Sequence, residues 1–253
     1  MEYTDREFMT IVAARQIKDH DIVFSGTGIS LLAATMAKMY YSPECTIFYE
    51  TGAIDPEILE IPMSVADSRV MYKSSINAGL FESFCLLQNR FTRDRIISIL
   101  GAAQIDKYGN LNTTCIGDYN NPQVRFPGSG GSCDATSFTR YIVFLAQEKR
   151  RFVRKLDYLT SPGYLSGGES RKKAGYESGG PEAVVTNMGL FKFDDEIKEM
   201  YLDQFRADVE IEDIRRRMEF EVDTSRAREI DSFSEEALET LRNEVDPKRL
   251  ILE

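Results

Sequence analysis

The sequence predicts an α/β fold: an open, mostly parallel sheet with helices on both faces, plus antiparallel hairpins. Short β-branched and aromatic runs at 22–24 and 46–49 are each followed by a glycine turn or a chain break. Glycine-containing turns at 106–110 and 187–189 are typical of hairpins. With 253 residues, 42% of them hydrophobic, the chain can bury a sizeable core, and we expect a single domain over 1–253.

The composition narrows the classes of function. A net charge of −10 argues against binding to nucleic acid or to an anionic membrane. No apolar run is long enough to span a bilayer, and the first residues lack the pattern of a signal peptide. We therefore expect a cytoplasmic protein with no nucleic-acid partner and no membrane partner.

The cysteines and the single histidine limit the chemistry. Cys45, Cys85, Cys115 and Cys133 are far apart and form no CxxC spacing. We expect four buried or half-buried free thiols in a reducing compartment, and no metal site. His20, between two aspartates, is expected at the surface. A Ser-His-Asp triad would need it, so an enzyme of this sequence rests on carboxylates, hydroxyls and backbone amides.

A strand, a glycine turn and a helix follow one another near the start of the chain. The strand 22–24 runs into Ser25-Gly26-Thr27-Gly28, and a helix is predicted over 29–40. This arrangement points backbone amides at an anion. A dinucleotide-binding GxGxxG motif would need glycine where Leu31 stands, which disfavours a nucleotide-binding oxidoreductase. A tight turn that merely needs glycine remains the alternative.

The stretch from Thr46 to Pro56 holds the first candidate for chemistry. Residues 46–49 form a predicted buried strand, Glu50 stands at its end, and Gly52 then breaks the chain. Open α/β sheets place ligand chemistry at the carboxyl ends of buried strands. The alternative is a glutamate that only starts a turn.

A second glycine-dense stretch runs from Arg125 to Asp134 and contains Gly128, Gly130 and Gly131. Three glycines in four positions permit backbone conformations that are closed to other residues. Such a loop can align N–H groups on an oxyanion or a phosphate. The alternative is a mobile surface loop.

The other predicted elements follow from local patterns of periodicity, capping and turns. They are a capping box at Thr4–Glu7 with its helix, a strand over 68–74, a helix over 77–88 with Leu80, Phe84, Leu86 and Leu87 inward, strands over 95–100, 111–116 and 141–145, a hairpin over 183–193, a helix over 209–218, and a capping box at Ser232–Glu235 with a helix to about Val245.

Together these pieces resemble the B (β) subunit of family I coenzyme A transferases, most closely the glutaconate CoA-transferase branch. The resemblance covers nearly the whole chain, and it depends on the order and spacing of several motifs. The most specific are Glu50-Thr51-Gly52, Gly101–Asp106 with Tyr108-Gly109-Asn110, Gly128-Ser129-Gly130-Gly131, Tyr158–Gly163, and Val184-Val185-Thr186 with Gly189 and Phe191.

The resemblance implies roles for individual residues. In that family the position of Glu50 carries the nucleophilic carboxylate, within a Glu-x-Gly motif that Thr51 and Gly52 complete here. Thr51 stands where the 3-oxoacid enzymes have Asn and the glutaconate enzymes Ser, so its small hydroxyl favours the glutaconate-like branch. The residues implied to line the oxyanion or CoA pocket are Gly128, Gly130, Gly131, Gly26 and Gly28.

The implied reaction moves CoA from an acyl-CoA thioester to a free carboxylic acid, with a dicarboxylic acid favoured by the branch. A glutamyl-CoA thioester on Glu50 is the implied intermediate. CoA is a substrate, and no permanently bound cofactor is expected. The implied partner is a separate A (α) subunit, which makes the enzyme a hetero-oligomer.

Two alternatives accompany this interpretation. Some relatives belong to hydrolases that open a cyclic ketone on a CoA thioester during steroid-ring degradation. We expect those to lack the nucleophilic glutamate, which is present here as Glu50. A non-catalytic partner subunit is the other alternative, because fold alone does not prove activity.

Overall fold

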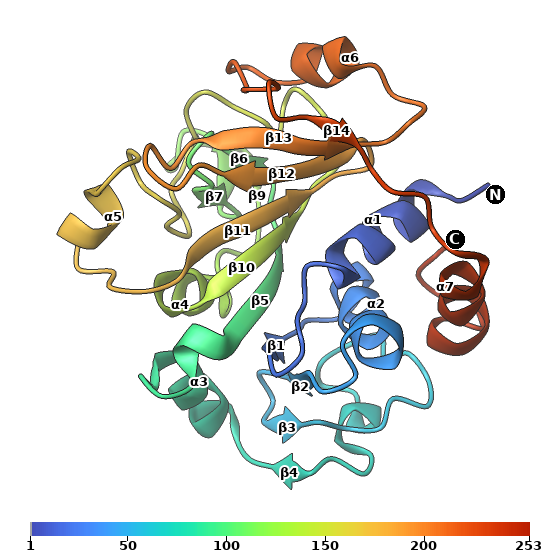
Figure 1. The fold of residues 1–253 in the computed structure, drawn as a ribbon. Helices are drawn as coiled ribbons and strands as arrows, with labels where there is room; N and C mark the ends of the chain where they lie inside the picture. The colour runs from blue at the N-terminus through green and yellow to red at the C-terminus, as the bar shows by residue number, and fades with distance from the viewer. Residues whose placement is uncertain (1) are drawn as a thin grey trace. The chain divides into compact units, whose positions relative to one another are not determined.

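The computed structural model describes residues 2–253, which fall into two compact units (Figure 1). The first unit comprises the residues up to Leu100 together with Asp231–Glu253. The second unit comprises Gly101–Ile230.

The first unit has a sheet with a parallel centre. Its strands, in spatial order, are β4 (Ile76–Asn77), β3 (Ala53–Ile54), β2 (Thr46–Phe48), β1 (Ile22–Phe24) and β5 (Ile96–Gly101). Strand β1 pairs in parallel with β2 and with β5, whereas β3 is antiparallel to both β2 and β4. The carboxyl ends of β1 and β2 therefore lie side by side, next to the two segments that follow them.

Helices accompany the first unit's strands. They are α1 (Asp5–Ala14), α2 (Ile29–Met36), α3 (Leu80–Gln88) and α7 (Glu235–Thr240). The capping box at Thr4 and Glu7 is confirmed, because each side chain bonds the other residue's backbone amide. Arg242 ties the C-terminal segment to α1 through an ion pair with the buried Glu7.

The second unit is built on a five-stranded arrangement with two small hairpins. Its strands are β6 (Gln104–Ile105), β7 (Leu111–Asn112), β8 (Cys115–Gly117), β9 (Pro122–Arg125), β10 (Arg140–Phe144), β11 (Gly180–Val185), β12 (Gly189–Phe193), β13 (Met200–Phe205) and β14 (Arg228–Glu229), and its helices are α4 (Ser132–Phe138), α5 (Ser170–Lys173) and α6 (Ile211–Arg216). Strands β10 and β11 are parallel, while β11, β12 and β13 form an antiparallel meander. The predicted α/β class, with parallel strands and antiparallel hairpins, is confirmed.

Several local predictions were wrong. The predicted strand at 68–74 is a 3₁₀ turn over Ser68–Met71, because the Asp67 carboxylate accepts from the Arg69 amide and stabilises a turn. The C-terminal helix begins at Glu235 and not after Ser232, because the Ser234 hydroxyl accepts from the Ala237 amide.

The burial predictions were wrong at two positions of one helix. Leu80 is 60% exposed and Cys85 is exposed, because α3 begins at Leu80 and buries only a narrow stripe. Cys45 and Cys115 are buried and Cys133 is half-buried, as expected. His20 is exposed and pairs with Glu44, which confirms its surface position.

Candidate active site

Glu50 lies at the tip of a tight hairpin between β2 and β3. The Tyr49 N–H donates to the Ala53 carbonyl at 3.0 Å, and the Gly52 N–H donates to the Tyr49 carbonyl at 3.0 Å. This pattern closes a three-residue loop, Glu50-Thr51-Gly52, whose last residue has a positive φ of 100°. The Glu50 side chain is half-buried, and no residue within 2–253 is hydrogen-bonded to it.

Gly52 is required both by its conformation and by its surroundings. A Cβ at this position would lie 2.2 Å from the Ala78 carbonyl oxygen and 2.4 Å from its carbon. The Ala78 N–H in turn donates to the Gly52 carbonyl at 2.9 Å. From α3, the Ser83 hydroxyl donates to the Tyr49 carbonyl at 2.8 Å. The glycine two residues after Glu50 therefore lets the backbone after β4 pack directly against the loop.

The turn after β1 stands beside this loop. Strands β1 and β2 are parallel neighbours, and the Ser25 N–H donates to the Phe48 carbonyl at 3.1 Å. Gly28 has a φ of 79° and precedes α2, whose Leu31 amide donates to the Gly28 carbonyl. Within residues 2–253 the amides of Gly26 and Gly28 have no acceptor. The structure thus brings the predicted Gly26–Gly28 turn and Glu50 together at the carboxyl ends of the neighbouring strands β1 and β2.

Two hydroxyls next to Glu50 are buried without a hydrogen-bond partner among residues 2–253. They belong to Tyr49 and Thr51. Burial raises the pKa of the Tyr49 phenol well above its usual value, so this hydroxyl stays protonated. A buried polar group without a partner is costly and needs an explanation. Tyr49 was not predicted as a site residue, because residues 46–49 have the pattern of an ordinary core strand.

The glycine loop of the second unit is anchored at several points. The Gly128 N–H donates to the Thr113 carbonyl at 3.1 Å, and the Ser132 and Ser161 hydroxyls lie 2.9 Å apart. Gly128 and Gly130 have positive φ angles of 96° and 50° with open space where a Cβ would stand. In the part of the chain that the structure describes, the amides of Gly130 and Gly131 have no acceptor.

The motifs around Asn110 and Gly163 build the scaffold under this loop. The Asn110 amide group donates to Asp106 and to the Leu165 carbonyl, and its oxygen accepts from the Gly163 and Leu165 amides. A Cβ on Gly163 would lie 2.4 Å from the Gly109 carbonyl carbon. These residues hold the segment that contains Ser161, so their role is structural.

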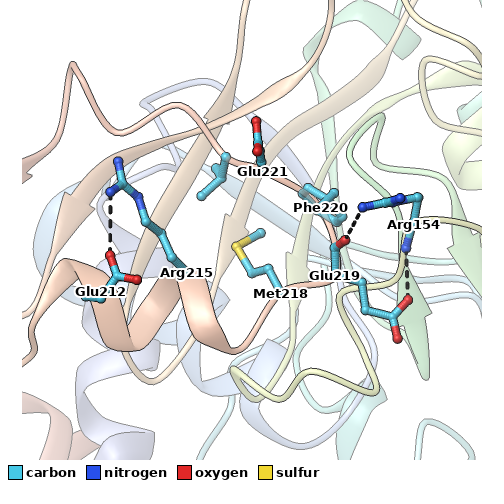
Figure 2. A pocket seen from close by; sticks show the side chains of 8 residues that line it. Arg154, Glu212, Arg215, Met218, Glu219, Phe220 and Glu221 are labelled. Atoms are coloured by element: carbon cyan, nitrogen blue, oxygen red, sulfur yellow. Dashed lines mark hydrogen bonds and ion pairs between the residues drawn. The ribbon is translucent and has the colours of Figure 1, made fainter.

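A cavity of about 420 Å³ in the second unit contains none of the predicted site residues (Figure 2). It is lined by Arg154, Glu212, Arg215, Met218, Glu219, Phe220, Glu221 and Val222. Its two arginines face three glutamates, and Figure 2 shows Arg154 bonded to Glu219 and Arg215 paired with Glu212. This balance of charge does not suit the phosphates of CoA.

Neither a metal site nor a membrane span is found in the described residues. Within 2–253, no group of three or more His, Cys, Asp or Glu side chains is arranged to hold a metal ion. None of the helices in that range has the length and apolar content needed to cross a bilayer.

The chain matches one family model and is similar in sequence to two characterised subunits. Residues 6–217 match the family model described as Coenzyme A transferase. The B subunit of glutaconate CoA-transferase from Acidaminococcus fermentans is 37% identical over 254 residues, which cover 99% of this chain and 96% of the relative. The B subunit of 3-oxoadipate CoA-transferase from Pseudomonas knackmussii is 36% identical over 193 residues, covering 75% of this chain and 73% of the relative.

A solved structure is similar over the whole chain. The crystal structure of glutaconate coenzyme A-transferase from Acidaminococcus fermentans superimposes with a TM-score of 0.96 at 36% sequence identity. The superposition covers 100% of this chain and 98% of that chain.

Proposed function

This chain belongs to the coenzyme A transferase family, and from that premise we propose that Glu50 is its nucleophile. The chain is homologous to the B subunits of glutaconate and 3-oxoadipate CoA-transferases, which confirms the predicted resemblance. The observation that carries the proposal is the position of Glu50, at a hairpin tip beside amides that have no acceptor within residues 2–253.

The proposed reaction begins with attack of the Glu50 carboxylate on the thioester carbonyl of an acyl-CoA. The C–S bond breaks, which leaves a mixed anhydride on Glu50 and free CoA thiolate. The thiolate then attacks the Glu50 carbonyl carbon, so that the acyl group departs as a carboxylate and Glu50 becomes a CoA thioester. An acceptor carboxylate repeats the two steps in reverse, leaves as the new CoA ester and restores the Glu50 carboxylate.

Each of these steps passes through a tetrahedral oxyanion, which backbone amides can stabilise. We assign this role, or contact with CoA, to the amides of Gly130 and Gly131, with Gly128 shaping their loop. Gly26 and Gly28 are assigned the same role from the turn beside Glu50. Loss of one donor from an oxyanion hole typically costs about 3 kcal/mol of transition-state stabilisation. Thr51 and Gly52 support the hairpin that presents Glu50.

We propose a dicarboxylic acid as one of the acyl groups, because glutaconate and 3-oxoadipate, which name the two relatives, are both dicarboxylic acids. CoA takes part as a substrate and not as a resident cofactor. The free thiols fit a cytoplasmic setting. The ring-opening hydrolase alternative is not favoured, since both of these relatives, at 37% and 36% identity, are named CoA-transferases.

We further propose that an A subunit docks on the exposed apolar segment, which we define as residues 59–91 of the first unit. The large apolar side chains that it exposes are Leu59, Met63, Met71, Tyr72, Ile76, Leu80, Phe81 and Phe91. Charged side chains beside them are paired within the chain, as in Arg69 with Asp67 and Lys73 with Glu57. Exposed aromatic and methionine side chains are typical of interface cores.

This segment is continuous with the Glu50 hairpin, because β4 pairs with β3 and Ala78 contacts Gly52. A partner docked there would cover the hairpin and exclude water, which would otherwise hydrolyse the anhydride. Phe81 is 77% exposed. Its replacement by Glu should lower the affinity for the A subunit at least about 30-fold, and less A subunit should co-purify with the variant. Ile197→Glu, at an exposed apolar residue of the second unit, is the matched control and should leave affinity unchanged.

The test of the nucleophile is mass analysis of the chain co-purified with its A subunit and given acyl-CoA thioesters without an acceptor acid. A CoA adduct on the Glu50 peptide is expected, and the thioester that forms it fastest identifies the donor class. Glu50→Ala should form no adduct and transfer no CoA, whereas the exposed control Glu44→Gln should behave as wild type. Full transfer by Glu50→Ala would refute the assignment.

A further inference from the structure

Arg171, on α5, is almost fully buried, at 4% exposed, and its guanidinium bonds only to backbone carbonyls. Nη1 donates to Pro162 at 3.4 Å and Gly163 at 2.9 Å, and Nη2 donates to Thr136 at 2.8 Å, Ser137 at 3.1 Å and Ser178 at 2.9 Å. In sequence it opens the run Arg171-Lys172-Lys173, which is typical of an exposed basic patch. The structure therefore gives this residue a role that its sequence context does not indicate.

Arg171 forms no ion pair with any carboxylate of residues 2–253. The ring of Tyr176 lies 5.0 Å from its guanidinium carbon. Hydrogen bonds from a charged donor are roughly twice as strong as neutral ones. Truncation of Arg171 would leave several buried carbonyls without a donor, and the segments they belong to would no longer be joined by hydrogen bonds to one guanidinium.

Four of the five carbonyls that Arg171 binds come from two segments that hold the glycine loop. Thr136 and Ser137 belong to the last turn of α4, whose carbonyls have no partner inside the helix. Pro162 and Gly163 follow Ser161, which bonds to Ser132 at the other end of α4. Helix α4 is thus clamped at both ends to the same segment. At seven residues it is about 10 Å long, and the glycine loop enters it directly at Gly131.

We propose that Arg171 is a positioning residue for the glycine loop. Its guanidinium fixes the last turn of α4 against Pro162 and Gly163, and through this helix it sets where the amides of Gly130 and Gly131 point. This inference rests on the proposed function of that loop. Catalytic donors need placement to within a fraction of an ångström, and a misplacement of about 1 Å can cost about 100-fold in rate.

The experiment compares Arg171→Met and Arg171→Lys with Arg242→Met, all co-purified with the A subunit. Arg242 is the matched control, because its guanidinium also bonds a buried group, Glu7, but in the first unit. The variants are compared at a temperature where circular dichroism shows all of them folded. Arg171→Met should slow formation of the Glu50 adduct about 30- to 100-fold. In steady-state transfer the loss should appear in kcat, with a smaller change in KM. Arg171→Lys should recover part of this rate, and Arg242→Met should stay within about 2-fold of wild type.

Hydrogen–deuterium exchange over residues 126–138 tests the placement without depending on the reaction. Arg171→Met should speed exchange there by at least about tenfold, and Arg242→Met should not. Wild-type adduct formation and exchange in both Arg171→Met and Arg171→Lys would overturn the proposal. Absence of the adduct in the wild type would instead refute the nucleophile assignment, and the exchange result would still decide the role of Arg171. If Arg171→Met does not fold, the same two measurements on Arg171→Lys decide.

Discussion

Replacement of Gly52 by alanine should destabilise the protein far more than a typical glycine substitution. Two terms add up. A φ of 100° is strained for any residue with a Cβ, at about 1–3 kcal/mol. The new Cβ would also lie 2.2 Å from the Ala78 carbonyl oxygen, and forcing backbone apart to fit it costs about 1–3 kcal/mol more. We therefore expect a loss of about 4 kcal/mol in the free energy of unfolding.

Gly28→Ala is the control that separates the two terms. Gly28 also has a positive φ, of 79°, but no atom lies within 4 Å of where its Cβ would stand. Only the conformational cost applies there, about 1–3 kcal/mol. Urea unfolding followed by circular dichroism measures both variants, and the Gly52 variant should also melt about 10 °C lower than wild type.

The same substitution should affect the reaction. Moving the Ala78 backbone away displaces the loop that carries Glu50, and a shift of about 1 Å should slow adduct formation about 100-fold. If Gly52→Ala is no less stable than Gly28→Ala, the backbone contact does not constrain the hairpin, and the argument from packing is refuted.

Three further predictions concern other parts of the chain. Gly130→Val, at a φ of 50°, should turn the loop amides away and reduce transfer about 100-fold, and unchanged kinetics would remove this loop from the site. Burial raises the pKa of Glu7, but hydrogen bonds, above all from Arg242, reverse this and hold it below its ordinary value of 4.5. The ionised Glu7 carboxylate therefore stabilises the folded protein above pH 4.5, and this stabilisation is lost as the pH falls through the folded-state pKa. Arg242→Met should lower the free energy of unfolding by about 3 kcal/mol at neutral pH. The difference from wild type should become smaller when the free energy of unfolding is measured at increasingly acid pH. Iodoacetamide should label exposed Cys85 in the native protein while Cys45, whose pKa burial raises to about 11, reacts only after unfolding; early labelling of Cys45 would contradict its burial.

Local signals in the sequence were sufficient for most elements. The capping box at Thr4 and the strands beginning at Ile22 and Thr46 depend on residues that are neighbours in the chain, and the structure has them at those places. The strand predicted at 68–74 failed, because the Asp67 carboxylate accepts a hydrogen bond from the Arg69 amide that stabilises a turn there, and apolar alternation does not report such a bond. The position of Glu50 after a buried strand was also predictable, because the strand and the residue after it are contiguous.

Contacts between distant residues were not predictable in this way. Nothing in the sequence around Gly52 indicates that Ala78 packs against it, and Arg171 has the neighbours of a surface residue. Both features depend on which segments the fold brings together. The unpaired hydroxyl of Tyr49 belongs to the same class, because its lack of a partner is a property of the packed structure.

The three-residue loop at the hairpin tip also limits how this enzyme can diverge. Its first residue is committed to the proposed chemistry, and its third is committed to glycine by the backbone of Ala78. The middle residue, Thr51, is fixed by neither of these two requirements, and its hydroxyl is buried without a hydrogen-bond partner among residues 2–253. A saturation library at position 51 therefore tests which side chains this loop accepts while Glu50 and Gly52 are kept.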